Sequence, residues 1–382
     1  MQRYRALTWD HPRGYNALAA AAARLDPARD GLAILWDKQP LEGFESHPIA
    51  DLCARYDIIV LDHPHVGEAV EANCLRPVEE IFGEAAVAEL AAQTIGPCLS
   101  SYRYAGRYWA LPLDAATQVM AARGDLVEET LPAIWADVER LSAKTGKVAM
   151  SLAGPHAILS YLAIATALGE PPAMRDPEVL VSEESGKTAL ELLAALASRS
   201  PESVRDKNPI GILSHMALND DVILCPLVYG YVNYAAPETG QPLAFANAPR
   251  LAAGLRPGST LGGTGIGISK RCAITPQLKR HLLWLMSGEA QTGFIPFHDG
   301  QPSRRSAWID EAINKRWRDF YRDTADTLEM AYVRPRHGGY IAFQGKASAL
   351  LRDALEQGRK ASAIVADIQA LYRASRRAGQ ER

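Results

Sequence analysis

The sequence predicts an α/β fold, built around a parallel sheet and divided into two domains. Along the first hundred residues, short apolar runs alternate with amphipathic helical patterns. The apolar runs are continuous, as expected of strands that helices cover on both faces. The length of 382 residues exceeds the roughly 100–200 residues of an ordinary domain, which favours two domains.

Each expected element follows from its local pattern. Continuous apolar runs predict strands at 6–9, 32–36 and 57–61, and helical periodicity predicts helices at 15–25, 47–56, 66–73 and 84–93. Two strand segments flank the turn Ala105-Gly106, and an extended crossover then passes through Leu111-Pro112. A second α/β series follows, with helices at 131–146, 155–169, 185–199, 275–294 and 360–377 and strands at 147–154, 221–231 and 259–270.

Composition excludes several classes of protein. With 48% hydrophobic and 22% charged residues and a net charge of -3, the chain is folded and carries no basic footprint for nucleic acid. No apolar stretch is long enough to span a membrane. Five cysteines, odd in number and widely spaced, predict buried thiols rather than a disulfide framework or a zinc site. No cofactor is predicted.

The tripeptide Asp-His-Pro occurs twice, as Asp10-His11-Pro12 and as Asp62-His63-Pro64, each time directly after an expected strand. In parallel sheets ligands bind beyond the carboxyl ends of the strands, so both copies belong to one edge. Proline ends the strand ladder and keeps the preceding residue extended. We therefore expect both imidazoles at the rim of a ligand site.

Several segments carry a family resemblance: "GRYWALPLDAATQ" (106–118), "PAIWADV" (132–138), "LGGTGIGIS" (261–269), "FHDGQPSRRSAW" (297–308) and "AYVRPRHGGY" (331–340). In this order they resemble the solute-binding proteins of carbohydrate-type ABC transporters, extracellular solute-binding family 1. The resemblance implies a two-lobed, periplasmic-binding-protein-like type II fold with three crossovers, which encloses its ligand by hinge closure. It implies one lobe of residues 1–112 and 262–305 and another of 113–261 and 306–382.

The resemblance also implies a set of ligand-binding side chains and a function. The protein would capture a small polar solute, such as a sugar, a polyol or a sugar acid, for the permease subunits of an ABC importer. Aromatic faces with carboxylates and guanidinium groups suit polyhydroxyl ligands. The implied binding residues are His11, Arg13, Tyr15, Asp62, His63, His65, Asp114, Thr117, His156, Tyr229, Tyr231, Asn233, Thr264 and Arg304.

The many potential cationic donors among these residues predict an acidic group on the ligand. Four histidines and two arginines are more cations than a neutral sugar needs. An imidazole with an ordinary pKa of about 6.5 gains its proton as pH falls from about 8 to 6. Binding is therefore expected to strengthen on acidification.

Two alternatives stay open, an enzyme and a cytosolic sensor on the same fold. Neighbouring Asp and His could form a base with its orienting group, or could bind a metal. No H-E-x-x-H or G-x-S-x-G motif occurs, and for a thiol enzyme the nearest candidates are Cys98 and Cys225. The family implies a periplasmic protein, but the chain begins "MQRYRALTW" with no export signal, so a cytoplasmic location stays open.

Overall fold

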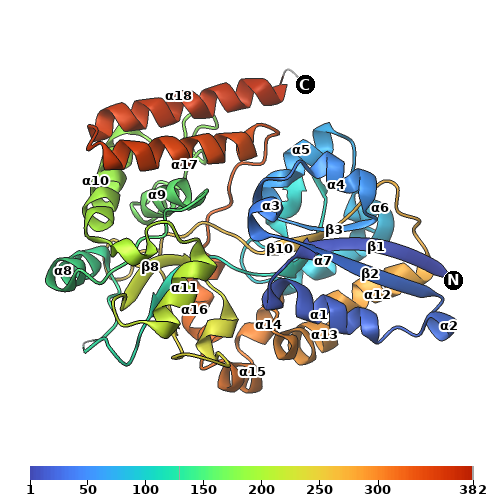
Figure 1. The fold of residues 1–382 in the computed structure, drawn as a ribbon. Helices are drawn as coiled ribbons and strands as arrows, with labels where there is room; N and C mark the ends of the chain where they lie inside the picture. The colour runs from blue at the N-terminus through green and yellow to red at the C-terminus, as the bar shows by residue number, and fades with distance from the viewer. Residues whose placement is uncertain (129, 381–382) are drawn as a thin grey trace. The chain divides into compact units, whose positions relative to one another are not determined.

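The computed structural model describes residues 1–128 and 130–380 and consists of two compact α/β units (Figure 1). Unit 1 comprises Met1–Ala116, Gly262–Asn314 and Arg336–Gly338, and unit 2 comprises the remaining segments. The predicted α/β class is confirmed. The lobe boundaries expected after residues 112, 261 and 305 stay a prediction. The chain passes between the units after Ala116, Leu261 and Asn314, and again on either side of the short segment Arg336–Gly338.

Unit 1 contains one five-stranded sheet and one small hairpin. Its strands are β1 (Gln2–Trp9), β2 (Leu32–Gln39), β3 (Ile58–Leu61), β6 (Leu111–Asp114) and β10 (Thr264–Ile268), with the hairpin β4 (Arg103–Tyr104) and β5 (Arg107–Tyr108). Its helices are α1 (Pro12–Ala23), α2 (Pro27–Asp30), α3 (Leu41–Ser46), α4 (Ile49–Arg55), α5 (Val66–Glu71), α6 (Val78–Phe82), α7 (Glu84–Gln93), α12 (Pro276–Met286), α13 (Gly288–Gly293) and α14 (Arg305–Trp308), together with the 3₁₀ turns η1 (His63–His65), η2 (Ser100–Tyr102) and η5 (Ile295–His298). Helix α15 (Glu311–Arg316) spans the last boundary.

The strand order of the sheet is β2-β1-β3-β10-β6. Strands β1, β2 and β3 run parallel, as predicted, but β10 runs antiparallel to both β3 and β6. The sequence predicts the strand at β10 but not its direction, which makes the sheet mixed. Because of this reversal, the amino end of β10 lies at the same edge as the carboxyl ends of its neighbours: Gly265 pairs with Leu61, and Thr264 pairs with Asp114.

Both faces of the sheet are buried, which explains the continuous apolar runs. On β3, Ile58 and Val60 belong to the core that α1, α6, α7 and α12 cover. The alternate residues Ile59 and Leu61 belong to the opposite core, under α4 and α5. A strand packed on both sides needs apolar residues at every position.

Unit 2 is mainly helical around a three-stranded sheet. Its strands are β7 (Gln118–Ala122), β8 (Leu224–Tyr229) and β9 (Ala244–Ala246). Its helices are α8 (Trp135–Thr145), α9 (His156–Ala167), α10 (Glu183–Arg199), α11 (Pro209–Leu218), α16 (Phe320–Glu329), α17 (Tyr340–Glu356) and α18 (Ala361–Gln380), with η3 (Glu202–Val204) and η4 (Val232–Ala235). Strand β7 lies between β8 and β9 and is antiparallel to both.

Helix α9 forms the centre of unit 2, because all its residues are buried. Helices α10 and α17 pack against it, and α18 lies beside α17 (Figure 1). The last helix packs an apolar stripe into the core, because Ile364, Ile368 and Tyr372 are buried. Among the described residues, no helix combines the length and apolar character needed to cross a membrane.

The strand expected at 147–154 does not form. Only Val148 bridges to β8, at Leu224, and the Ala149 N–H donates to the same residue's carbonyl at 2.8 Å. The chain then leaves the sheet and turns at Gly154, which has φ +56°, to begin α9. A positive φ suits glycine and is incompatible with a continuing strand.

Gly258 is required where the chain crosses α9. A Cβ atom at this position would lie 2.1 Å from the Ala163 carbonyl oxygen and 2.5 Å from the Ala167 nitrogen. We expect Gly258→Ala to lower the free energy of unfolding by about 1–3 kcal/mol, since helix backbone cannot move aside cheaply. Urea denaturation measures this.

The matched control is Gly345→Ala, in the exposed interior of α17, where an added Cβ meets no atom within 4 Å. This variant should gain about 0.5–1 kcal/mol, because alanine favours helix over glycine. A loss at Gly345, or no loss at Gly258, would contradict the packing described.

Candidate functional site

The first Asp-His-Pro motif joins β1 to α1. Pro12 is the first residue of the helix and His11 is its N-cap, with Nδ1 accepting a hydrogen bond from the Arg13 N–H at 3.1 Å. Proline suits the first helical position, because its missing N–H would have no partner there. The motif therefore starts a helix in addition to ending a strand.

The guanidinium group of Arg13 forms a buried ion pair with Asp114. Nε donates to Oδ1 at 2.9 Å and Nη2 to Oδ2 at 2.6 Å, and both side chains are about 95% buried (4% and 5% exposed). The guanidinium carbon also lies 5.9 Å from the centre of the Trp9 ring. This pair ties the start of α1 to the end of β6, and each charge is offset by the other.

The second motif forms a tight turn after β3. The Asp62 carboxylate accepts a hydrogen bond from the His63 N–H at 2.8 Å, and the same oxygen lies 3.0 Å from His63 Nδ1. Both His63 and His65 are buried, and the His63 ring stands edge-on to Tyr102 with centroids 6.5 Å apart. The two imidazoles therefore lie in the interior and not at an open rim.

Three other expected residues of unit 1 differ in their surroundings. Thr264 is buried beside Asp114, and its hydroxyl has no hydrogen-bond partner among the described residues. The Lys38 ammonium nitrogen lies over the Tyr15 ring, 4.8 Å from the ring centre. Arg304 donates to the side chain of Gln93, and its N–H donates to Gln291, so its contacts are with α7 and α13 rather than with Asp114.

In unit 2, β7 and β8 bring Gln118 opposite Tyr229. The Tyr229 hydroxyl reaches the Leu261 carbonyl at 3.5 Å. Thr117, one residue before β7, contacts the Ser259 hydroxyl and donates to the Thr260 carbonyl at 3.1 Å. The Thr117 hydroxyl therefore holds the start of β7 against residues 259 and 260.

His156, the first residue of α9, is buried with its ring 5.8 Å from that of Tyr229. Arg334, which the sequence analysis does not single out, is also buried and donates to Gln344 at 2.9 Å and to the Leu261 carbonyl at 3.1 Å. Its one sequence signal is its place in the segment "AYVRPRHGGY". Burial, followed by the charges of Arg334 and Arg352, lowers the pKa of His156 to about 3.

Two further residues follow the end of β8. Tyr231 is buried, and Asn233, in η4, is half-buried with a side-chain oxygen that has no partner among the described residues. Ser151 lies on the segment that runs beside β8. Its hydroxyl is buried and also has no hydrogen-bond partner among the described residues. Sequence reasoning missed Ser151, because it lies within the segment expected as a strand.

The electrostatics contradict the expected titration at two of the histidines. Burial, and then the neighbouring Arg13 charge, lower the pKa of His11 to about 4. With His156 at about 3, both imidazoles are neutral between pH 6 and 8. Neither can supply a proton-dependent attraction for an acid in that range.

Two of the enzyme alternatives need a metal cluster or a reactive thiol, whereas the Asp62–His63 contact is in place. Within the part of the chain that the structure describes, no three His, Cys, Asp or Glu residues are placed to hold a metal ion. Cys98 and Cys225 are both buried, and burial raises the pKa of the Cys225 thiol to about 12. A thiol with such a pKa is not a nucleophile at neutral pH.

Comparison with solved structures places the fold among two-lobed solute-binding proteins of ABC transporters. Maltose-bound MalE3 of T. maritima matches with a TM-score of 0.81 and 16% identity, over 97% of this chain and 99% of that one. An ABC transporter solute-binding protein of Agrobacterium radiobacter K84, in complex with ribitol, matches with a TM-score of 0.79 and 19% identity, over 97% and 98%. One from Agrobacterium vitis S4, with bound D-mannitol, matches with a TM-score of 0.74 and 14% identity, over 99% of both chains.

The sequence itself identifies the family. A profile of bacterial extracellular solute-binding proteins matches residues 50–307, which is more than half of the chain. The chain therefore belongs to the family of bacterial extracellular solute-binding proteins, and the resemblance noted in the sequence is confirmed. No curated protein matches it by sequence.

Breaking the buried pair Arg13–Asp114 should lower the free energy of unfolding far more than breaking a surface pair. Arg13→Ala leaves a buried carboxylate without its cation, and we expect a loss of about 3–5 kcal/mol in the free energy of unfolding. As a control, Arg140→Ala breaks the exposed pair with Asp137, whose arginine side chain is 69% exposed, and should cost less than about 1 kcal/mol. Similar losses in urea denaturation of the two variants would contradict the assignment.

The pKa of His156 predicts a pH dependence of stability. An unfolded imidazole takes up its proton near pH 6.5, whereas His156 stays neutral down to about 3. Protons therefore favour the unfolded chain in this interval. As the pH decreases, the free energy of unfolding decreases by up to about 1.4 kcal/mol per pH unit. We expect His156→Gln to reduce this slope between pH 6 and 4 in urea titrations; an unchanged slope would refute the burial of a neutral imidazole.

Proposed function

We propose that the protein captures a small, neutral polyhydroxyl solute, a sugar or a polyol, and delivers it to the permease of an ABC importer. The family supports solute capture. The proposal takes from the family architecture that the ligand lies between the two lobes and that the lobes close on it. It also takes from the family that the protein works outside the cytoplasm.

The observation that carries the solute class is that each unit by itself contains buried polar atoms without partners among the described residues. Unit 1 contributes Trp9 Nε1 and Thr264 Oγ1, and unit 2 contributes Ser151 Oγ and Asn233 Oδ1. A buried polar atom left unpaired costs about 1–3 kcal/mol. This mixture of donors and acceptors suits hydroxyl groups, because each hydroxyl both donates and accepts.

The charges favour a neutral solute over a sugar acid. Arg13 is compensated by Asp114, whereas Arg304 keeps its charge and donates to the neutral side chain of Gln93, away from Asp114. His11 and His156 carry no charge near pH 7, given pKa values of about 4 and 3. The relatives bound to ribitol and D-mannitol support the same class of ligand.

A thermal-shift screen followed by calorimetry tests the solute class. Ribitol, mannitol and maltose are the neutral probes, and gluconate is the acidic probe. We expect a neutral probe to stabilise the protein saturably, with the free energy of unfolding higher by about 2.7 kcal/mol at a hundredfold excess over Kd. Its affinity should be equal at pH 6 and 8. Preference for gluconate, tighter at pH 6, would overturn the neutral class.

The unpaired atoms supply the variants. Thr264→Val and Asn233→Ala each remove one hydrogen-bonding group, and we expect each to raise Kd for the best neutral ligand about fivefold or more, which corresponds to about 1 kcal/mol. Thr188→Val, at an exposed position on α10, is the matched control and should leave Kd unchanged. Chemical conversion of the ligand during long incubation, followed by NMR, would favour the enzyme alternative instead.

A further inference from the structure

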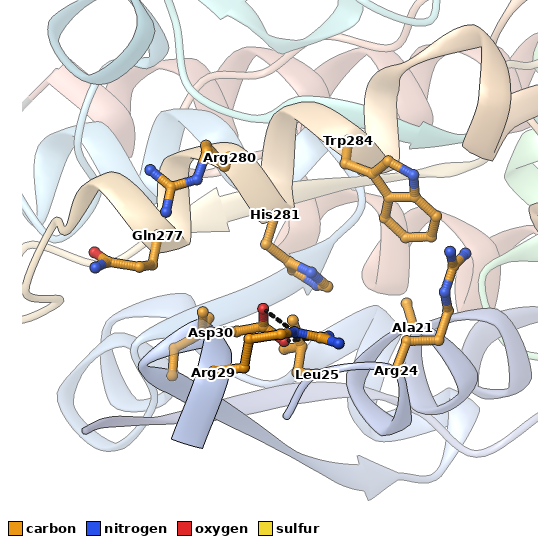
Figure 2. A pocket seen from close by; sticks show the side chains of 10 residues that line it. Ala21, Arg24, Leu25, Arg29, Asp30, Gln277, Arg280, His281 and Trp284 are labelled. Atoms are coloured by element: carbon orange, nitrogen blue, oxygen red, sulfur yellow. Dashed lines mark hydrogen bonds and ion pairs between the residues drawn. The ribbon is translucent and has the colours of Figure 1, made fainter. Parts of the chain in front are cut away.

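Unit 1 has a recess at the amino ends of its parallel strands, opposite the end of the sheet where the strand-end groups lie. It has a volume of about 330 Å³ and lies where the end of α1, helix α2 and the start of β2 meet α12 (Figure 2). The eight residues of β1 separate the two ends by about 25 Å. The lining residues are Ala21, Arg24, Leu25, Arg29, Asp30, Leu32, Gln277, Arg280, His281 and Trp284.

The recess carries a surplus of positive charge. Three arginines line it with one carboxylate, that of Asp30. Arg29 is engaged by Asp30 through contacts of 3.0 and 2.9 Å. Arg29 and, through its charge, Arg280 both lower the pKa of Asp30. Arg24 lies 3.9 Å from Glu289 and over the rings of Trp284 and Phe294. Figure 2 shows the Arg280 and Arg24 side chains at opposite ends of the recess, with His281 between them. Arg280 is therefore the cation for an anion at one end, while Arg24 lies at the other end over Trp284.

A buried imidazole supplies a hydrogen-bonding group beside these charges. His281 is only 8% exposed, yet its ring has no hydrogen-bond partner among the described residues. Figure 2 shows this ring pointing from α12 towards Leu25 and Asp30. Burial and then the Arg24 charge lower the pKa of His281 to about 4, so the neutral ring offers one N–H and one acceptor nitrogen near pH 7.

The same recess provides an apolar wall. The Trp284 ring lies beneath the Arg24 guanidinium, with the carbon 4.7 Å from the ring centre, and the imidazole centre is 6.1 Å from it. Leu25 and Ala21 line the recess from α1 and the residues after it. A flat or apolar body can be covered here while an attached charge reaches a guanidinium group.

We propose that this recess is a second binding site, for a small organic anion that carries a phosphate or carboxylate group on a flat apolar body. Arg280 attracts the anionic group at one end of the recess, His281 hydrogen-bonds to the ligand, and Trp284, at the end beside Arg24, covers its apolar part. The dimensions favour a small molecule over a polymer segment. The site is independent of the solute proposed above, since it lies at the other end of the sheet.

Calorimetry of the full chain at low salt tests the site with phenyl phosphate, benzoate and the neutral analogue phenol. We expect saturable binding of phenyl phosphate or benzoate, and the stronger of the two identifies the anionic group; phenol should not bind measurably. Saturation by neither anion at millimolar concentrations, or equal binding of phenol, would overturn the proposal.

Arg280→Gln should weaken binding of the better anion about tenfold or more. The control Lys279→Gln also removes one positive charge from α12, but outside the lining, and should change Kd less than about twofold.

Trp284→Leu should weaken binding of phenyl phosphate more than that of inorganic phosphate. Equal effects of the two charge variants would show a diffuse electrostatic attraction and refute a defined site. Polyol binding by Arg280→Gln should stay unchanged, which separates this proposal from the solute-binding function.

Discussion

The antiparallel insertion of β10 between β3 and β6 is the constraint on which the arrangement of the strand-end residues of unit 1, the candidate site, depends. It brings Thr264 next to Asp114 and places both at the edge where β1 and β3 end. The close approach needs glycine: a Cβ at Gly265 would lie 2.7 Å from the Tyr102 ring. The glycine-rich sequence of β10 thus follows from tight packing rather than from phosphate binding.

At the same end of the sheet the protein buries two charges that cancel each other, so that the pair does not attract ions. The Arg13–Asp114 pair fixes the first turn of α1 against the end of β6, and its two charges compensate each other. Burial keeps His11 uncharged near neutral pH by lowering its pKa to about 4. Recognition at such an edge depends on the number and direction of hydrogen bonds, which is how a site distinguishes one hydroxylated solute from another.

Local patterns predicted the parts of the fold that depend on local chemistry. Continuous apolar runs revealed the strands buried on both faces. Gly106 between two strand segments revealed the turn at Ala105-Gly106, where the structure gives both residues a positive φ. The direction of β10 was not predictable, since strand direction depends on partners far away in the chain. For the same reason the sequence suggested Arg13 and Asp114 as ligand groups but could not show that they bind each other across 101 positions. The low pKa of His156 likewise arises from burial and from Arg334, neither of which a local motif reveals.

The discontinuous course of the chain has a consequence for how the protein is made. The third strand of unit 1 lacks its neighbour β10 until the whole segment from Thr117 to Leu261 has been synthesised. Until then β3 presents an unpaired apolar edge, and the early part of unit 1 cannot complete its sheet. Unit 2 also waits for α17 and α18, which complete the packing around α9. The nascent chain therefore stays incompletely folded until late in translation, and a partner that holds unfolded chains has a long interval in which to engage it.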